Sequence, residues 1–200
     1  MRATKIIPNN FHHHKTLDFS SPRAAVWLNL AAIPMVFLYG WLFSRIFTFF
    51  RLNNPSARGS WGIFPGFSAL ELIALILAVI FMFTFHEMVH GAFFWIFTGE
   101  RPKFGLRAGY AFAAAPDWHL PRSQYIIVGL SPFVVISILS IIIATFSSST
   151  IVLYLLYIAT FNAAGALGDM IVVAWVLRQS SSVLVQDQGD KFIIFAPENE

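Results

Sequence analysis

Four long apolar runs leave this chain few ways to fold. They cover residues 24–44, 68–97, 124–146 and 150–177. At about 1.5 Å of rise per residue, the first run makes a helix of roughly 30 Å, which is the thickness of a bilayer's hydrocarbon core. Only 12% of the residues are charged, whereas soluble domains average about 25%. The sequence therefore predicts an all-α polytopic membrane protein with about four transmembrane helices.

The polar segments divide the chain into three parts. We expect a cytoplasmic tail over residues 1–23, a four-helix transmembrane domain over 24–178 and a second cytoplasmic tail over 179–200. The first tail has no long apolar stretch, so a cleavable signal peptide is not expected. Apolar stretches on both sides of residues 187–190 predict a small β-hairpin. Alternating large apolar residues over 104–112 predict a short strand in a cytoplasmic loop, and the alternative is a re-entrant or interfacial loop that packs on the helices.

The distribution of lysine and arginine predicts the orientation, because positive charge stays on the cytoplasmic side. The two tails, the loop at 98–123 and Arg178 at the end of the last apolar run together account for ten of these residues, and the connector at 45–67 carries three. Both termini are therefore expected in the cytoplasm. The basic residues are scattered and form no single stripe, so we expect a lipid bilayer and a polypeptide substrate as partners and no nucleic acid. The absence of cysteine excludes disulfides and thiolate metal sites.

Three ionisable groups stand together within the second apolar run, in the sequence His86-Glu87-Met88-Val89-His90. Each costs about 2.5–3.5 kcal/mol at mid-membrane and needs a partner. On a helix the two histidines project from one face and can share a zinc ion, with Glu87 placed to act as the catalytic base. In a chain of this length and composition, the expected number of chance occurrences of this pattern is roughly 0.004. The alternative is a pair of core histidines bonded to their neighbours.

Asp169 is the best candidate for a third zinc ligand. It lies 19 residues past the start of the fourth run, and His86 lies 18 past the start of the second. Both runs are expected to cross inward, so these residues reach the same depth. The alternative is a carboxylate at a helix end that pairs with Arg178 or Lys191.

Other polar residues have weaker assignments. Asn162 lies two helical turns before Asp169, and we expect it to donate a hydrogen bond to an oxyanion in catalysis, to hold a ligand in place, or to bond between helices. His119 is an alternative ligand, although a solvated loop histidine is expected there. The histidines at 12–14 are interpreted as incidental in a flexible tail. Glu71 is expected to cap its helix or reach the interface, without chemistry.

A transmembrane His-Glu-Met-Val-His motif followed by Gly168 and Asp169 in a later segment resembles the site-2-protease type of intramembrane zinc protease. The resemblance covers residues 68–178 and is greatest to a compact bacterial membrane family of zincin peptidases. In site-2 proteases a glycine follows the ligand aspartate, whereas Met170 follows here.

The resemblance implies a zinc endopeptidase of the bacterial cytoplasmic membrane that cleaves membrane or membrane-proximal proteins near the cytoplasmic face. It also implies an exposed strand edge that holds the substrate extended. Two alternatives remain: an inactive metal-binding scaffold or regulator, and a metal or proton transporter. The presence of Glu87 favours the enzyme, because a scaffold needs no base, and no inverted repeat supports a transporter.

Overall fold

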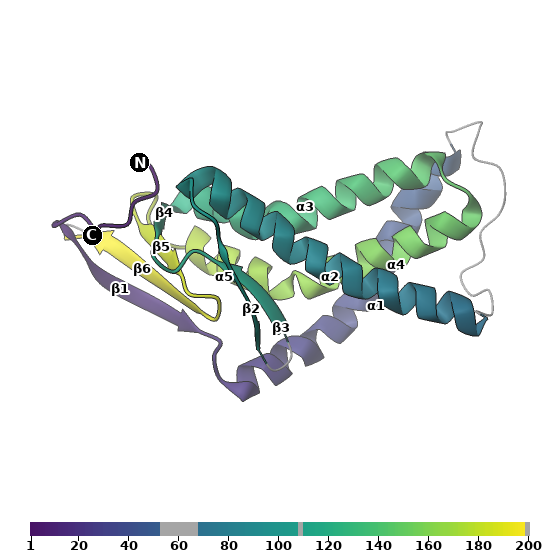
Figure 1. Cartoon of the computed structure of the whole chain (residues 1–200), viewed down its shortest axis with the longest axis horizontal. Helices are drawn as coiled ribbons and strands as arrows, with labels where there is room; N and C mark the ends of the chain where they lie inside the picture. The colour runs from purple at the N-terminus through teal and green to yellow at the C-terminus, as the bar shows by residue number, and fades with distance from the viewer. Residues whose placement is uncertain (53–67, 108–109, 199–200) are drawn as a thin grey trace. The chain divides into compact units, whose positions relative to one another are not determined.

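The computed structural model describes residues 1–52, 68–107 and 110–198 of the chain (Figure 1). Its helices are α1 (Pro22–Leu52), α2 (Ala69–Thr98), α3 (Arg122–Phe146), α4 (Ser149–Gly165) and α5 (Leu167–Leu177). Its strands are β1 (Phe11–Asp18), β2 (Lys103–Arg107), β3 (Tyr110–Ala114), β4 (His119–Pro121), β5 (Leu184–Asp187) and β6 (Lys191–Pro197).

The helices are long and apolar enough to agree with the prediction of about four membrane spans. By length and composition α1, α2 and α3 could each cross a membrane, and α4 with α5 would make a fourth span.

Large apolar side chains lie on the outside of α1 and α2. Trp27 and Phe37 on α1, and Leu70 and Phe81 on α2, each expose at least 70% of their surface. Removing one such side chain from water is worth about 1.5–3 kcal/mol. A surface of this kind is costly in water and suits the hydrocarbon of a bilayer.

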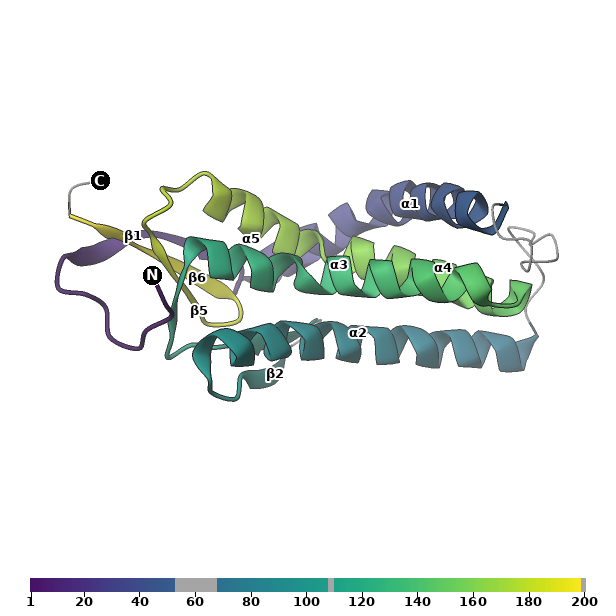
Figure 2. The ribbon, with the colours of Figure 1, turned by 90° about the horizontal axis from the view of Figure 1, so that it is seen from above.

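The chain divides into two compact units, and the described residues of one of them contain helices and no strand. It comprises Leu30–His86 and Phe133–Ala166. Its core joins α1, α3 and α4 through Phe43, Phe47, Ala144, Val152, Leu156, Ala159 and Ala163. Only Ser147 and Ser148 separate α3 from α4, and the two helices form an antiparallel pair (Figure 2).

Side chains satisfy two helix ends in this unit. The backbone N–H of Ser68 donates to Glu71 Oε2 over 2.8 Å, and the N–H of Glu71 donates to Ser68 Oγ over 3.3 Å. This reciprocal capping box confirms the capping role expected for Glu71. Buried Arg51 donates from Nη1 to the carbonyls of Ala144 and Ser147 at the end of α3, where a positive charge is favourable.

The other unit contains the strands, and it corrects the all-α prediction. It comprises Met1–Asn29, Glu87–Pro132 and Leu167–Glu200. Its antiparallel sheet has the order β1-β6-β5-β4 (Figure 1). The predicted hairpin around residues 187–190 is confirmed as β5 and β6, and the strand predicted over 104–112 is a separate hairpin of β2 and β3.

The first tail is not the flexible segment that was expected. Residues 11–18 form β1, which pairs along its length with β6, so the histidines at 12–14 lie in a strand. Alternate residues of β6 are buried, but residues 192–196 are apolar throughout, so the sequence alone does not show this alternation. The residues of β1 are mostly exposed, so pairing with β6 and not their own hydrophobicity makes them a strand.

Two helix boundaries also differ from the prediction. Residues 45–52, which were expected to be connector, continue α1, and the rest of that connector, 53–67, lies outside the described residues. The fourth apolar run is two helices bent by 44°. The break falls at Ala166, between Gly165 and Gly168, where the residues stay apolar and hydropathy cannot reveal it.

Candidate metal centre

Helix α2 carries the motif residues His86, Glu87 and His90. The two histidines stand one turn apart on the same helix, so the helix itself brings their rings to one side. Both are buried, with exposures of 5% and 7%, in a protein segment that is otherwise almost wholly apolar. Glu87 is half-buried.

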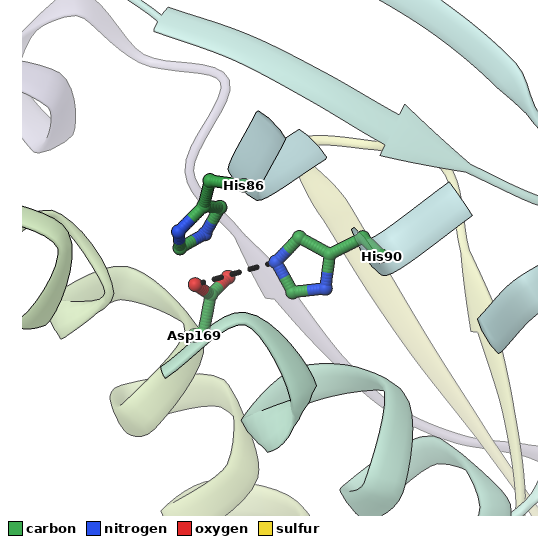
Figure 3. A group of neighbouring side chains, drawn as sticks. All are labelled: His86, His90 and Asp169. Carbon is green, nitrogen blue, oxygen red and sulfur yellow. Dashed lines mark ion pairs between the residues drawn. The ribbon is translucent and has the colours of Figure 1, made fainter. Parts of the chain in front are cut away.

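A backbone carbonyl orients the ring of His90. The Nδ1 atom lies 3.0 Å from the carbonyl oxygen of Val128 on α3. A carbonyl can only accept a hydrogen bond, so Nδ1 carries the proton and Nε2 is left as the coordinating nitrogen of the neutral ring. This Nε2 atom faces Asp169 at the start of α5, with 3.4 Å to Oδ2 (Figure 3).

Asn162 makes the equivalent contact with His86. The distance between His86 Nδ1 and Asn162 Oδ1 is 2.9 Å, and both residues are buried. An amide oxygen that accepts from Nδ1 fixes the ring and directs Nε2 away from Asn162. This contact agrees with two of the roles expected for Asn162, holding a ligand in place and bonding between helices; a role toward an oxyanion stays a prediction.

His86, His90 and Asp169 form one group that could hold a metal ion. One ligand atom from each residue lies within 4.8 Å of the others (Figure 3). Two ligands of a tetrahedral zinc, at about 2.0–2.1 Å from the ion, stand about 3.3 Å apart. The 3.4 Å between His90 Nε2 and Asp169 Oδ2 agrees with this separation. Two imidazoles with one carboxylate are also a donor set of catalytic zinc sites, so these residues fit zinc.

The structure pairs Asp169 with His90. The alternative partner Lys191 instead lies 3.3 Å from Asp18 Oδ2.

His119 is not the solvated loop histidine that was expected. It lies in β4 with an exposure of 5%, its ring stands edge-on to Phe195, and Nδ1 is 3.3 Å from the carbonyl of Thr4. Burial lowers the pKa of His119 below its ordinary value. It does not belong to the group of potential ligands in the described part of the chain.

A buried acid near this group, Asp187, was not predicted from the sequence. The hydroxyl of Tyr125 on α3 donates to Asp187 Oδ2 over 2.9 Å, and the N–H of Gly189 donates to Oδ1 over 2.7 Å. Burial raises the pKa of Asp187 to about 6, against the opposing effect of these two bonds. The sequence around Asp187 predicted only a turn. An aspartate in a turn is ordinarily exposed, so nothing in the sequence indicated that this one is buried.

Two glycines allow the β2–β3 hairpin to approach the motif and the turn. A Cβ atom on Gly91, next to His90, would lie 2.5 Å from the ring of Phe104 in β2. A Cβ atom on Gly189 would lie 2.6 Å from the ring of Phe112 in β3. The hairpin is therefore held against the end of α2 that carries His90.

Residues 79–184 match the profile of a family described as "Putative zincin peptidase". No curated protein and no solved structure matches the chain. The match covers more than half of the chain and includes the two histidines, Glu87, Asn162 and Asp169. This protein therefore belongs to that zincin peptidase family.

Proposed function

We propose that the chain is a membrane-embedded zinc endopeptidase that cleaves membrane or membrane-proximal proteins near the cytoplasmic face. The convergence of His86, His90 and Asp169 in one group, on helices long enough to cross a membrane, carries the proposal. Membership of a zincin peptidase family supports it. The excess of positive charge in the tails and the 98–123 loop supports a cytoplasmic location for both termini.

His86, His90 and Asp169 are the proposed ligands. The bonds from each Nδ1 to Asn162 and to Val128 hold the rings so that both Nε2 atoms remain available to a metal. When bound, zinc supplies a Lewis acid that polarises the scissile carbonyl and lowers the pKa of a water toward about 7.

Glu87 is the proposed proton carrier. It follows His86 directly on α2 and is half-buried, so it remains open to a small reactant. Its carboxylate takes a proton from the attacking water as the new C–O bond forms. It then gives that proton to the departing amine as the C–N bond breaks.

The β2–β3 hairpin is the proposed substrate-handling element. Among the described residues β2 and β3 pair only with each other, and an extended peptide can add to the outer edge of such a two-stranded sheet through main-chain hydrogen bonds. The packing of Phe104 on Gly91 keeps this hairpin beside the residue that follows His90. A substrate paired along it would be extended, as peptide hydrolysis requires.

The decisive experiment compares zinc content with peptide cleavage in purified protein. We expect Glu87→Gln to keep one equivalent of zinc but lose cleavage of a fluorogenic peptide library. His90→Ala and Asp169→Ala should lose both. Glu71→Gln makes the same chemical change as Glu87→Gln on the same helix and should keep both.

Two results would contradict the proposal. If the parent protein holds no zinc after metal loading, the proposed metal centre is wrong. If the parent and Glu87→Gln cleave equally, Glu87 is not the catalytic base. Zinc binding without any cleavage in either protein would favour a metal-binding scaffold.

A further inference from the structure

The carbonyl that orients His90 lacks its ordinary helical partner. In an α-helix the carbonyl of residue 128 accepts from the backbone N–H of residue 132. Residue 132 is proline and has no N–H. Nevertheless α3 continues through this position from Arg122 to Phe146.

Side chains supply the missing donors. The Val128 carbonyl accepts from His90 Nδ1 over 3.0 Å and from Ser131 Oγ over 2.8 Å. Val128, His90 and Ser131 are all buried, so water cannot readily replace either bond. A buried carbonyl without a partner is costly, and the imidazole N–H of His90 therefore satisfies a need that the proline creates.

We propose that Pro132 is a positioning residue of the metal centre, because it frees the Val128 carbonyl to hold His90 with Nε2 available to zinc. This inference rests on the proposed role of His90 as a ligand. All the residues it uses lie in the same compact unit of the chain.

Restoring the amide would work against this arrangement. An N–H at position 132 would compete with His90 for the Val128 carbonyl, because the regular helical bond would become available. The ring of His90 would then be less restrained in rotation and in the position of its proton. Loss of such a partner typically weakens metal binding about 10- to 100-fold.

Pro132→Ala and Pro34→Ala provide a matched pair of variants. Both prolines lie inside long apolar helices, Pro132 in α3 and Pro34 in α1. Zinc affinity is measured in detergent by competition with a chromophoric chelator, with zinc alone as the probe. We expect affinity to fall about 10- to 100-fold in Pro132→Ala and to stay at the parent value in Pro34→Ala.

Stability separates positioning from a general structural role. Alanine is a much better helix former than proline, so the thermal midpoint of zinc-free Pro132→Ala should equal or exceed that of the parent. Weaker zinc binding in a protein that is no less stable supports positioning. Unchanged zinc affinity in Pro132→Ala, or an equal loss in Pro34→Ala, would overturn it.

Two further measurements keep the test decisive if Pro132→Ala does not fold. Pro132→Leu restores the same N–H with a larger side chain, and it should lose affinity in the same way. In the zinc-loaded parent, ¹⁵N NMR of labelled histidine should show the proton of His90 on Nδ1, and coordination through Nδ1 would refute the inference. A parent that binds no zinc refutes the proposed function instead.

Discussion

Replacing Asp187 by asparagine should stabilise the protein at neutral pH but not in acid. Burial raises the pKa of Asp187 from 3.8 to about 6 in the folded protein. A raised pKa means that the folded state binds the proton more tightly than the unfolded state. Stability from this group is therefore complete below pH 3.8 and is lost as the pH rises to about 6.

The free energy of unfolding falls by about 3 kcal/mol over this pH range, because the pKa of Asp187 rises from 3.8 to about 6 and each pKa unit is worth about 1.4 kcal/mol. Asparagine avoids this loss, since its Oδ1 can still accept from Gly189 and its amide can donate to the Tyr125 hydroxyl. At about 2–4 °C per kcal/mol for a chain of this size, the thermal midpoint of Asp187→Asn should exceed that of the parent by roughly 6–12 °C at pH 7.

The assay is a series of thermal melts of metal-free protein in detergent from pH 4 to pH 7. Asp117→Asn is the control, because Asp117 is exposed and the hydrogen bond from Lys103 lowers its pKa. The control should show no gain at pH 7, since it removes a favourable pair. A gain in Asp187→Asn that is the same at every pH would refute the assignment of its effect to a buried charge.

Two further substitutions test the packing around the motif. Asn162→Ala removes the bond to His86 Nδ1 and should weaken zinc binding about 10- to 100-fold, as measured by chelator competition; an unchanged affinity would show that the contact does not orient the ring. Gly91→Ala would place a methyl group 2.5 Å from the ring of Phe104 and should destabilise the protein by about 1–3 kcal/mol in thermal melts. A Gly91→Ala variant as stable as the parent would mean that the β2–β3 hairpin moves away easily.

Local patterns were sufficient to predict the long helices, though not their exact ends or the break at Ala166, and to propose the candidate ligands. The apolar runs predicted the spans because the length of a span depends only on consecutive residues. The spacing of His86 and His90 predicted a shared face because helical geometry is also local. Asp169 was found from its depth along a span, and the hairpin of β5 and β6 from two apolar stretches around a turn.

Contacts between distant segments decided the rest. Residues 11–18 form the strand β1 because they pair with β6. His119 is buried because Thr4 and Phe195 pack against it. The burial of Asp187 needs Tyr125, which lies 62 residues away. Hydropathy and periodicity describe a residue by its neighbours in the chain, so they predict helices and faces; which donor meets which acceptor depends on packing, and only the tertiary structure determines it.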